Sequence, residues 1–489
     1  MKKNISFTEE TIQKLFGHEA AEDEDESRLQ EYYFKSNIYK QVTANLSLRI
    51  LVGHKGTGKS ALFKMAMHED ISQGKLPILI QPNDIVDISI DDSNFLKKIQ
   101  IWTEGLLEII FNKILVHFEI YDNRVDNNSY KKNPKNFLKF LVNYLNNVNT
   151  DNEKTLSSIL NFLENPSINV YVDDLDRGWE GRKEDTNKIS ALLNAVRDIS
   201  NSNKHLNFKI ALRTDVYYLV RTSDESTDKT EGSVVWLAWK NHEIFILLIK
   251  RIETFFGRNI NEDELLNAHQ NQKFLAQKYL KPIIEDYFTG KGKWENAPMY
   301  RILMSLIRKR PRDLVKLCTL AAKMAYSRGS SIIQTEDFKS IFEEYSQGRI
   351  QDTVNEFKSE LPTIQNLLMN MKPNRRERTT QEGYVYTTAE LLEKIKNISE
   401  SSRFVWTNGK SAEPKELAAF MYKINFLTAR KETSSGIIRK YFEENRYLSS
   451  QFSDFGFSWE IHPAYRWALQ PDTIHDIFQN LDLSIDDNE

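Results

Sequence analysis

Residues 49–62 contain a loop whose residue types suit the binding of phosphate groups. The apolar segment RILV leads into GHKGTGKS, which fits the pattern G-x-x-x-x-G-K-[ST] from Gly53 to Ser60. Glycines permit backbone angles that other residues resist, so successive amides can turn toward phosphate oxygens. Lys59 would place its charge on the β- and γ-phosphates of a nucleotide, and the Ser60 hydroxyl would bind Mg²⁺.

The residues around this loop favour the same interpretation. The apolar run LSLRILV at 46–52 predicts a strand buried on both faces, and the residues after Lys59 predict a helix whose N-terminal dipole would face the anion. The alternative is a solvated glycine loop. We predict that the nucleotide contacts these residues: Gly53, His54, Lys55, Gly56, Thr57, Gly58, Lys59, Ser60 and Ala61.

A second apolar segment ends in two carboxylates. The run INVYVDD predicts a strand from Ile168 that ends at Asp173 and Asp174. Asp173 would join Ser60 in binding Mg²⁺, and Asp174 would polarise the attacking water, although aspartate is one methylene shorter than glutamate. The alternative is a strand end whose acids begin a turn.

A third predicted strand, LNFKIAL at 206–212, is followed by Arg213, Thr214 and Asp215. If this strand lies between the other two, Arg213 or Thr214 would sense the γ-phosphate. The alternative is that Arg213 is neutralised by Asp215 or Asp176.

The composition limits the class of protein. The chain has 489 residues, a net charge of −3 and 40% hydrophobic residues, so it is long enough for about three domains and is not a basic nucleic-acid coat. Its one cysteine, Cys318, excludes an intrachain disulfide. We see no signal peptide and no apolar run long enough to span a membrane, and we expect a cytoplasmic protein. The histidines show no spacing typical of metal ligands.

The pattern along the chain predicts an α/β fold: a P-loop NTPase with a three-layer parallel sheet, followed by an all-α lid and a C-terminal winged-helix-like domain. The acidic run EAAEDEDE at 19–26 is expected to be a solvated loop, and a β-hairpin is expected around FSDFGFSW at 452–459. The predicted parts are a leader at 1–45, a P-loop core at 46–239 with a helical insertion at about 90–150, a lid at 240–350, a winged-helix-like domain at 351–470 and an acidic tail at 471–489.

These motifs resemble a known family. GHKGTGKS, VYVDDLDR and the strand ending ALRTD resemble Walker A, Walker B and sensor 1 of AAA+-like P-loop ATPases. WKNHEIFILLIKRI and RPRDLVKLCTLAAKMAYSRGSSIIQTEDF are similar to the lid and sensor 2 of origin-recognition ATPases, with Arg312 at the sensor position. DDLDR also resembles KAP-type and STAND-type ATPases of bacteria, a wider group with members in antiphage defence. The resemblance covers residues 30–350.

The resemblance implies a Mg²⁺-dependent ATPase that acts as a switch or motor, with Lys59, Asp174, Arg213, Thr214 and Arg312 in catalysis. It further implies a role in antiphage defence, a homo-oligomer and a separate effector protein. In such an oligomer, Arg177 or Arg251 would reach the site of a neighbouring subunit.

Two alternatives belong to other classes. The first is a DNA-binding loader or initiator that would place Lys372, Arg375, Arg376 and Arg378 on phosphates, since residues 372–447 contain 15 Lys and Arg against 10 Asp and Glu. That cluster can equally be a solvated loop. The second is a scaffold that ATP locks into one conformation without hydrolysis.

Overall fold

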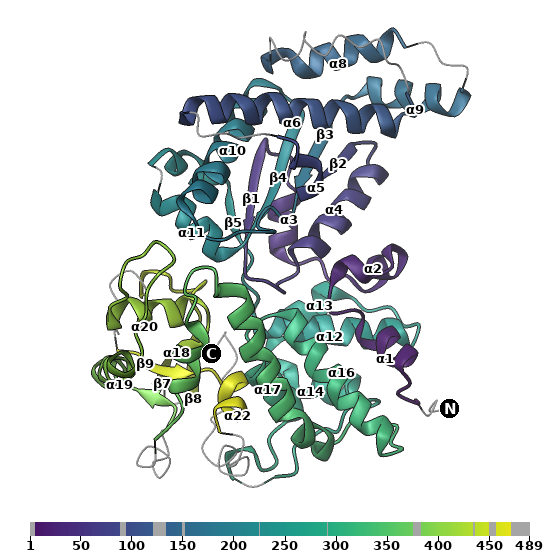
Figure 1. Ribbon diagram of the computed structural model, residues 1–489. Helices are drawn as coiled ribbons and strands as arrows, with labels where there is room; N and C mark the ends of the chain where they lie inside the picture. The colour runs from purple at the N-terminus through teal and green to yellow at the C-terminus, as the bar shows by residue number, and fades with distance from the viewer. Residues whose placement is uncertain are drawn as a thin grey trace. The chain divides into compact units, whose positions relative to one another are not determined.

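The computed structural model describes residues 5–88, 94–120, 134–148, 152–223, 225–290, 292–374, 383–433, 436–448 and 456–470. The chain forms two compact units. The sheet unit comprises Lys35–Lys55 and Lys59–Leu237, and the helical unit comprises Met1–Phe34, Gly56–Gly58 and Ala238–Glu489. Figure 1 labels the helices and strands of both units.

The sheet unit is built on five parallel strands in the order β2-β3-β4-β1-β5. This order places β4 between β1 and β3, which was the condition for a sensor residue at the end of β4. The P-loop α/β fold predicted from the sequence is confirmed. The strands are β1 Leu48–Val52, β2 Leu76–Ile80, β3 Ile168–Val172, β4 Leu206–Leu212 and β5 Val234–Trp236.

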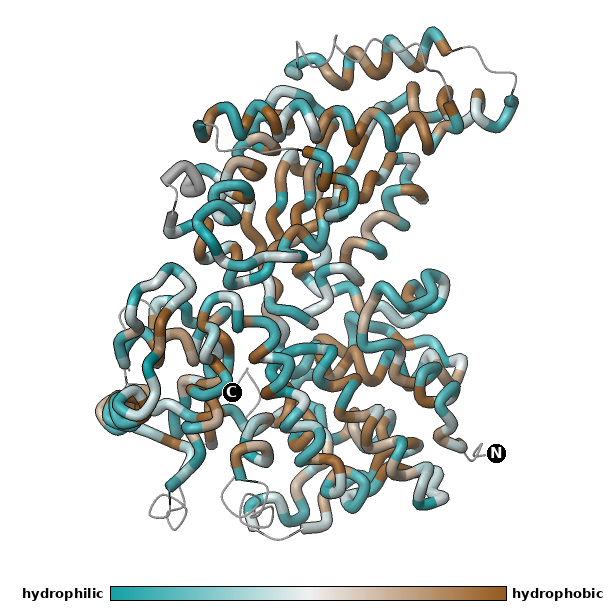
Figure 2. Tube along the Cα trace, viewed as in Figure 1, coloured by the Kyte–Doolittle hydropathy of each residue, from teal (hydrophilic) through white to brown (hydrophobic). Residues whose placement is uncertain are grey.

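Side chains alternate between the two faces of a strand, and both faces of this sheet are covered. On one face, Ile50, Val170, Val172, Phe208 and Ile210 join a core with α6 (Phe95–His117) and α10 (Lys183–Ser202). Figure 2 shows the strands of this sheet as hydrophobic. The long α6 therefore belongs to the main core, although it lies within the predicted helical insertion.

The other face of the sheet holds a buried polar network under α4 (Lys59–Ser72). Asp70 of α4 accepts hydrogen bonds from Asn169 Nδ2 at 2.8 Å and from the Tyr171 hydroxyl at 2.6 Å. Asn207 Nδ2 donates in turn to Asn169 Oδ1 at 3.0 Å. A buried carboxylate needs such donors, so these bonds fix α4 against β3. The remaining helices of this unit are α3 Asn37–Thr43, α5 Pro82–Ile85, α8 Phe137–Asn146, α9 Glu153–Glu164 and α11 Thr214–Ser223.

The helical unit packs its apolar helix faces around a separate core. Ile244–Ile249 lie buried in α12, and Pro311 occupies the first turn of α16, which its fixed φ suits. The helices are α1 Glu9–Phe16, α2 Glu26–Tyr32, α12 Asn241–Phe255, α13 Glu262–Asn267, α14 Gln272–Tyr279, α15 Met299–Leu306, α16 Pro311–Ser327, α17 Thr335–Phe357 and α18 Ile364–Asn370.

The expectation of a solvated acidic loop at 19–26 is wrong in part. Glu24 is buried and accepts a hydrogen bond from the His18 amide at 2.7 Å, and it pairs with Arg28 at 3.4 Å. Phe7, Phe16, Tyr32 and Phe34 are buried, and α1 contacts α12 and α16. Apolar residues on both sides of the acidic run draw it onto the helical unit, a contact that local charge does not reveal.

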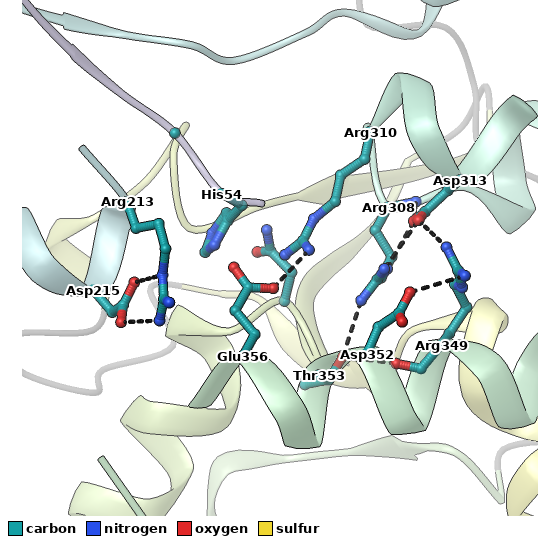
Figure 3. A network of polar contacts seen from close by, with 12 residues as sticks. His54, Arg213, Asp215, Arg308, Arg310, Asp313, Arg349, Asp352, Thr353 and Glu356 are labelled. Atoms are coloured by element: carbon teal, nitrogen blue, oxygen red, sulfur yellow. Dashed lines mark hydrogen bonds and ion pairs between the residues drawn. The ribbon is translucent and has the colours of Figure 1, made fainter. Parts of the chain in front are cut away.

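Buried ion pairs link the helices of this unit (Figure 3). Asp313 accepts from Arg308 Nε at 2.7 Å and from Arg349 Nη1 at 2.5 Å, and all three side chains are buried. Burial alone would raise the pKa of Asp313, but the two guanidinium groups outweigh it and lower that pKa strongly. Because a buried charge left without its partner costs about 3–5 kcal/mol, this network fixes α16 to α17.

The C-terminal part of the helical unit contains a second, antiparallel sheet in the order β6-β9-β7-β8. The hairpin predicted around 452–459 is wrong, because β9 pairs with β6 and β7 and the hairpin lies between β7 and β8. Arg375, Arg376, Arg378 and the acidic tail lie outside the described residues. The elements are β6 Val385–Tyr386, α19 Thr388–Ser401, α20 Pro414–Lys423, β7 Leu427–Thr433, β8 Gly436–Lys440, β9 Ser458–Ile461 and α22 Arg466–Leu469.

A buried carboxylate ties this sheet to α22. Glu460 of β9 pairs with Arg439 of β8 at 2.6 Å and with Arg466. Burial alone would raise the pKa of Glu460, but the two arginines lower it to about 2. Across the described part of the chain, no helix is long and apolar enough to cross a membrane.

Lys209 gives the sheet unit a testable pH dependence. Its Nζ donates to the Ala44 carbonyl at 2.9 Å, and burial lowers its pKa to about 8. Above this pH the folded chain releases a proton that the unfolded chain keeps until about pH 10.4, so the free energy of unfolding is expected to rise between these values by about 3 kcal/mol. Urea unfolding monitored across that range would measure this rise.

The matched variants separate Lys209 from other groups that titrate at alkaline pH. Lys209→Met should remove the rise, whereas Lys40→Met, which changes an exposed lysine of α3, should retain it. An equal rise in both variants would show that Lys209 is not its source.

Candidate nucleotide-binding site

The predicted phosphate loop connects β1 to α4. At its start, the Gly53 amide donates to the Leu212 carbonyl at 3.2 Å, which joins the loop to the end of β4. Gly56 has a φ of 81° and Gly58 a φ of 98°, so both occupy backbone conformations that favour glycine. Helix α4 begins at Lys59, so Lys59 and Ser60 lie in its first turn. The loop thus has the strand, glycine and helix order that phosphate binding requires.

Lys59, Ser60 and Asp173 come together in the sheet unit. Lys59 Nζ donates to the carbonyl oxygens of Gly53 at 2.9 Å and His54 at 3.1 Å. The Ser60 side chain forms a hydrogen bond with the Asp173 carboxylate. The structure therefore brings together the lysine, the hydroxyl and the carboxylate to which the sequence assigns phosphate and metal binding.

Asp173 lies in a site that favours binding of a cation. The residue is 9% exposed. Burial raises its pKa, and the hydrogen bond to Ser60 and the charge of Lys59 only partly offset this effect. A divalent cation would stabilise the ionised form of this carboxylate and restore the charge that burial disfavours.

The remaining residues of the predicted contact set lie along the same loop. His54 is buried, Lys55 is exposed, Thr57 is buried, and Ala61 follows Ser60 in the first turn of α4. The exposed Lys55 would contribute its backbone rather than its side chain.

Asp174 lies in a turn after β3. Its φ is 60° and its amide donates to Asp173 Oδ1 at 2.9 Å. Its carboxylate pairs with Arg177 at 2.8 Å, and the two side chains are 42% and 68% exposed. Arg177 therefore has a partner within its own chain, and the turn that the alternative interpretation required is present.

Arg213 and Thr214 follow β4 at the same edge of the sheet. Arg213 donates to both oxygens of Asp215, at 3.0 and 2.6 Å (Figure 3). It also pairs with Asp176 at 3.2 Å. Both counterions named as alternatives are thus in place. Thr214 is fully buried, and its hydroxyl has no hydrogen-bond partner among the described residues. A buried hydroxyl without a partner suits a position next to a ligand or a water molecule.

The middle of the phosphate loop, Gly56–Gly58, belongs to the helical unit, and Arg312 of that unit contacts it. Its amide donates to the Gly56 carbonyl at 3.3 Å, and its Nε donates to the Glu19 carbonyl at 3.0 Å. A Cβ atom built on Gly56 would lie 3.0 Å from Cβ of Arg312. Trp239 Nε1 donates to the Thr57 carbonyl at 2.8 Å. The predicted sensor is therefore in contact with the loop, and the Trp239 contact is one that no sequence pattern had indicated.

Arg251 is not positioned to reach a neighbouring subunit. Its guanidinium lies 4.5 Å from the ring centre of Tyr32 and donates to the Phe16 carbonyl. Burial lowers its pKa, and the nearby Tyr32 and Glu24 partly offset this effect. We conclude that Arg251 holds the N-terminal helices to α12, because its charge is used inside its own unit.

The residues present fit a magnesium nucleotide. Mg²⁺ usually takes one or two protein oxygens and completes its shell with water and substrate phosphates. Ser60 and Asp173 supply two such oxygens, and no group of three or more His, Cys, Asp or Glu in the described part of the chain could hold a metal by itself. This donor set is suited to a cation that arrives with phosphate groups.

Comparisons with known proteins found one family model and one similar protein sequence. Residues 243–354 match a family model described as the FunZ-associated C-terminal helical domain. A putative 80.3 kDa protein of transposon gamma-delta from Escherichia coli (strain K12) is 23% identical over an alignment 541 residues long, which covers 96% of this chain and 70% of that protein.

Similar solved structures are origin-recognition and branch-migration proteins. The Aeropyrum pernix ORC2 protein, in its ADPNP and ADP complexes, is 12% identical over 92% of this chain and 95% of its own, with a TM-score of 0.42. The Thermotoga maritima RuvB Holliday junction branch migration motor is 12% identical over 86% and 96%, with a TM-score of 0.35. The Aeropyrum pernix ORC1 protein in complex with DNA is 11% identical over 90% and 93%, with a TM-score of 0.32.

The chain resembles AAA+-like P-loop ATPases in its fold, as its motifs predicted. The sheet order, the phosphate loop after β1 and the carboxylates after β3 carry this assignment. The resemblance to KAP-type and STAND-type ATPases remains a prediction.

The two loop glycines provide a matched test of the geometry. Gly56→Ala would place Cβ 3.0 Å from Arg312, whereas Cβ at Gly58 would meet no atom within 4 Å. Both variants strain a positive φ, by about 1–2 kcal/mol, but only Gly56→Ala also displaces Arg312. Thermal unfolding should therefore show a larger loss of stability for Gly56→Ala. Equal losses would mean that Arg312 does not rest on Gly56.

Proposed function

We propose that this protein is a Mg²⁺-dependent ATPase that binds and hydrolyses ATP. The observation that carries the proposal is the meeting of Lys59, Ser60 and Asp173 at the carboxyl edge of a parallel sheet. Ligands in open α/β sheets bind outside this edge, and the glycine loop and the N-terminus of α4 supply the amides for phosphate.

Each of these residues has a distinct task in the proposal. Lys59 would exchange the carbonyls of Gly53 and His54 for phosphate oxygens, and Ser60 and Asp173 would hold the metal directly or through water. Mg²⁺ would neutralise charge on the β- and γ-phosphates when bound. Thr214 has a buried hydroxyl free to accept a partner, and Arg312 touches the loop that would hold the phosphates. The buried hydroxyl of Thr214 and the contact of Arg312 with the loop support the proposal that both residues act as sensors.

We propose further that ATP controls assembly and the action of a partner. An arginine from a neighbouring copy commonly completes such a site and raises the rate by about 10³–10⁵. Arg177 is the remaining candidate, since its side chain is 68% exposed and its pairing with Asp174 lies at the surface.

We also propose that the protein acts in antiphage defence with a separate effector protein. This proposal comes from the resemblance of DDLDR to bacterial defence ATPases. Similarity to a protein named for a transposon is compatible with a mobile genetic setting.

Lys59 provides the test of nucleotide binding. Lys59→Ala should weaken ATP binding by about 100-fold, because a charge-assisted hydrogen bond contributes up to about 3 kcal/mol. Titration calorimetry would measure the affinity, and light scattering would measure whether ATP still promotes oligomers. Lys40→Ala is the control, since it removes an exposed lysine of α3 that lies outside the phosphate loop. Unchanged ATP affinity in Lys59→Ala would refute the assignment.

A second candidate function is DNA binding by the C-terminal part of the chain. The order β6-α19-α20-β7-β8-β9, with a hairpin between β7 and β8, resembles a winged helix, in which a helix and a hairpin approach a duplex. Lys415 of α20 and Lys431 of β7 are exposed. Lys372 is also exposed, so the described part of the predicted basic cluster can reach a phosphate.

Salt dependence tests this second function. If Lys415 and Lys431 contact phosphates, Lys415→Glu with Lys431→Glu should weaken binding to duplex DNA and flatten the plot of log affinity against log salt by about 2. Fluorescence anisotropy over a range of salt concentrations would measure the slope. Lys278→Glu, at an exposed lysine of α14, is the control.

The third possibility is a scaffold that hydrolyses no ATP. Such a scaffold would show tight ATP binding with hydrolysis at background.

A further inference from the structure

Three carboxylates follow β3, and the structure gives them different surroundings. Asp173 is bonded to Ser60, and Asp174 is paired at the surface with Arg177. Asp176 lies two residues further, with a side chain only 13% exposed. We propose that Asp176, rather than Asp174, is the carboxylate that activates the attacking water. The inference rests on the proposed ATPase function and concerns which residue serves its site.

The conformation of Asp174 argues against this role. Its φ of 60° and the bond from its amide to Asp173 Oδ1 fix it in the turn. Its carboxylate is 42% exposed and lies 2.8 Å from the Arg177 guanidinium. Its carboxylate is thus engaged in an ion pair at the surface of the turn.

Asp176 has the surroundings that a general base needs. Its Oδ2 lies 3.2 Å from Arg213 Nη1, and its side chain is only 13% exposed. Burial raises its pKa, while Arg213 and Lys59 lower it and Asp215 and Asp174 raise it. The charge of Lys59 acts on Asp176 as it does on Asp173, so Asp176 lies within the electrostatic field of the phosphate-loop lysine.

Asp176 is not required to neutralise Arg213. Both oxygens of Asp215 accept from Arg213, at 3.0 and 2.6 Å, and the Asp215 side chain is 2% exposed. A bidentate pair satisfies the charge of one guanidinium. The site therefore holds two carboxylates, Asp215 and Asp176, beside one arginine whose charge the bidentate pair with Asp215 already neutralises.

In the proposed step, Arg213 orients Asp176 and the carboxylate accepts a proton from water. The water oxygen forms a bond to the γ-phosphorus, and the bond from that phosphorus to the β,γ-bridging oxygen breaks. The electron pair of the broken bond remains on ADP, and the water proton ends on Asp176, so that the products are ADP and phosphate.

Paired substitutions test the assignment. Asp176→Asn and Asp174→Asn make the same chemical change at two positions of one turn. Asp176 lies three residues after Asp173, and Asp174 lies one residue after it. Asp176→Asn should lower kcat by about 10²–10⁴ and leave the Kd for ATP within about threefold, because the phosphate loop is intact. Asp174→Asn should lower kcat by less than about tenfold. Asp198→Asn, at an exposed residue of α10, is the control for a neutral change.

Two readouts complement the steady-state rate. Calorimetry gives the Kd of each variant for ATP, and chromatography of the nucleotide recovered with Asp176→Asn should find ATP rather than ADP. Asp176→Glu should regain part of the lost rate, because it restores a carboxylate. Loss of ATP binding in Asp176→Asn would show a structural role and overturn the inference.

The remaining outcomes distinguish this inference from the proposed function. If Asp174→Asn shows the larger loss, or if the two variants lose the same rate, Asp176 is not the base, although the protein remains an ATPase. If the unmodified chain neither binds nor hydrolyses ATP, the proposed function fails, and the assignment of Asp176 fails with it.

Discussion

The parallel pairing of β1, β4 and β3 is the constraint on which the candidate site depends. Val52 pairs with Leu212, and Ile210 pairs with Val172, so the three strands end at one edge of the sheet. Residues far apart in the sequence, Gly53, Asp173 and Arg213, follow these ends directly. A shift of one residue in this register would turn each apolar side chain to the opposite face, so the buried core holds the site in place.

The two faces of the same sheet are stabilised differently. One face is apolar and packs on α6 and α10, whereas the other carries Asn169, Asn207 and Lys209, and Asn169 donates to Asp70 of α4. Burial of apolar area has little directional preference, but hydrogen bonds specify position. We infer that the polar face fixes where α4 begins, and thereby where Lys59 and Ser60 lie relative to Asp173.

In the part of the chain that the structure describes, two buried carboxylates each form a triad with arginines. Asp313 with Arg308 and Arg349, and Glu460 with Arg439 and Arg466, each place one carboxylate between two guanidinium groups. The Arg213 cluster reverses this ratio, with two carboxylates to one guanidinium. Burial penalises an excess of like charge, and in the Arg213 cluster the second carboxylate is not neutralised by a guanidinium of its own. This cluster is therefore better suited to chemistry than to stability.

The sequence by itself determined the elements that local patterns encode. The phosphate loop and the apolar strands that precede Asp173 and Arg213 could be predicted because each depends on residue types within about ten positions. The assignment of Arg312 as a sensor came only from a family resemblance. The structure places Arg312 against Gly56.

Only the tertiary structure decided which side chains meet. It placed β9 beside β6 and β7 instead of in its own hairpin, drew Glu24 into the helical unit, and engaged Arg251 with Tyr32. It also separated the exposed Asp174 from the buried Asp176 within one short turn. The physical reason is that pairing, burial and desolvation depend on neighbours distant in the chain, whereas strand and loop formation depend mainly on neighbours in sequence.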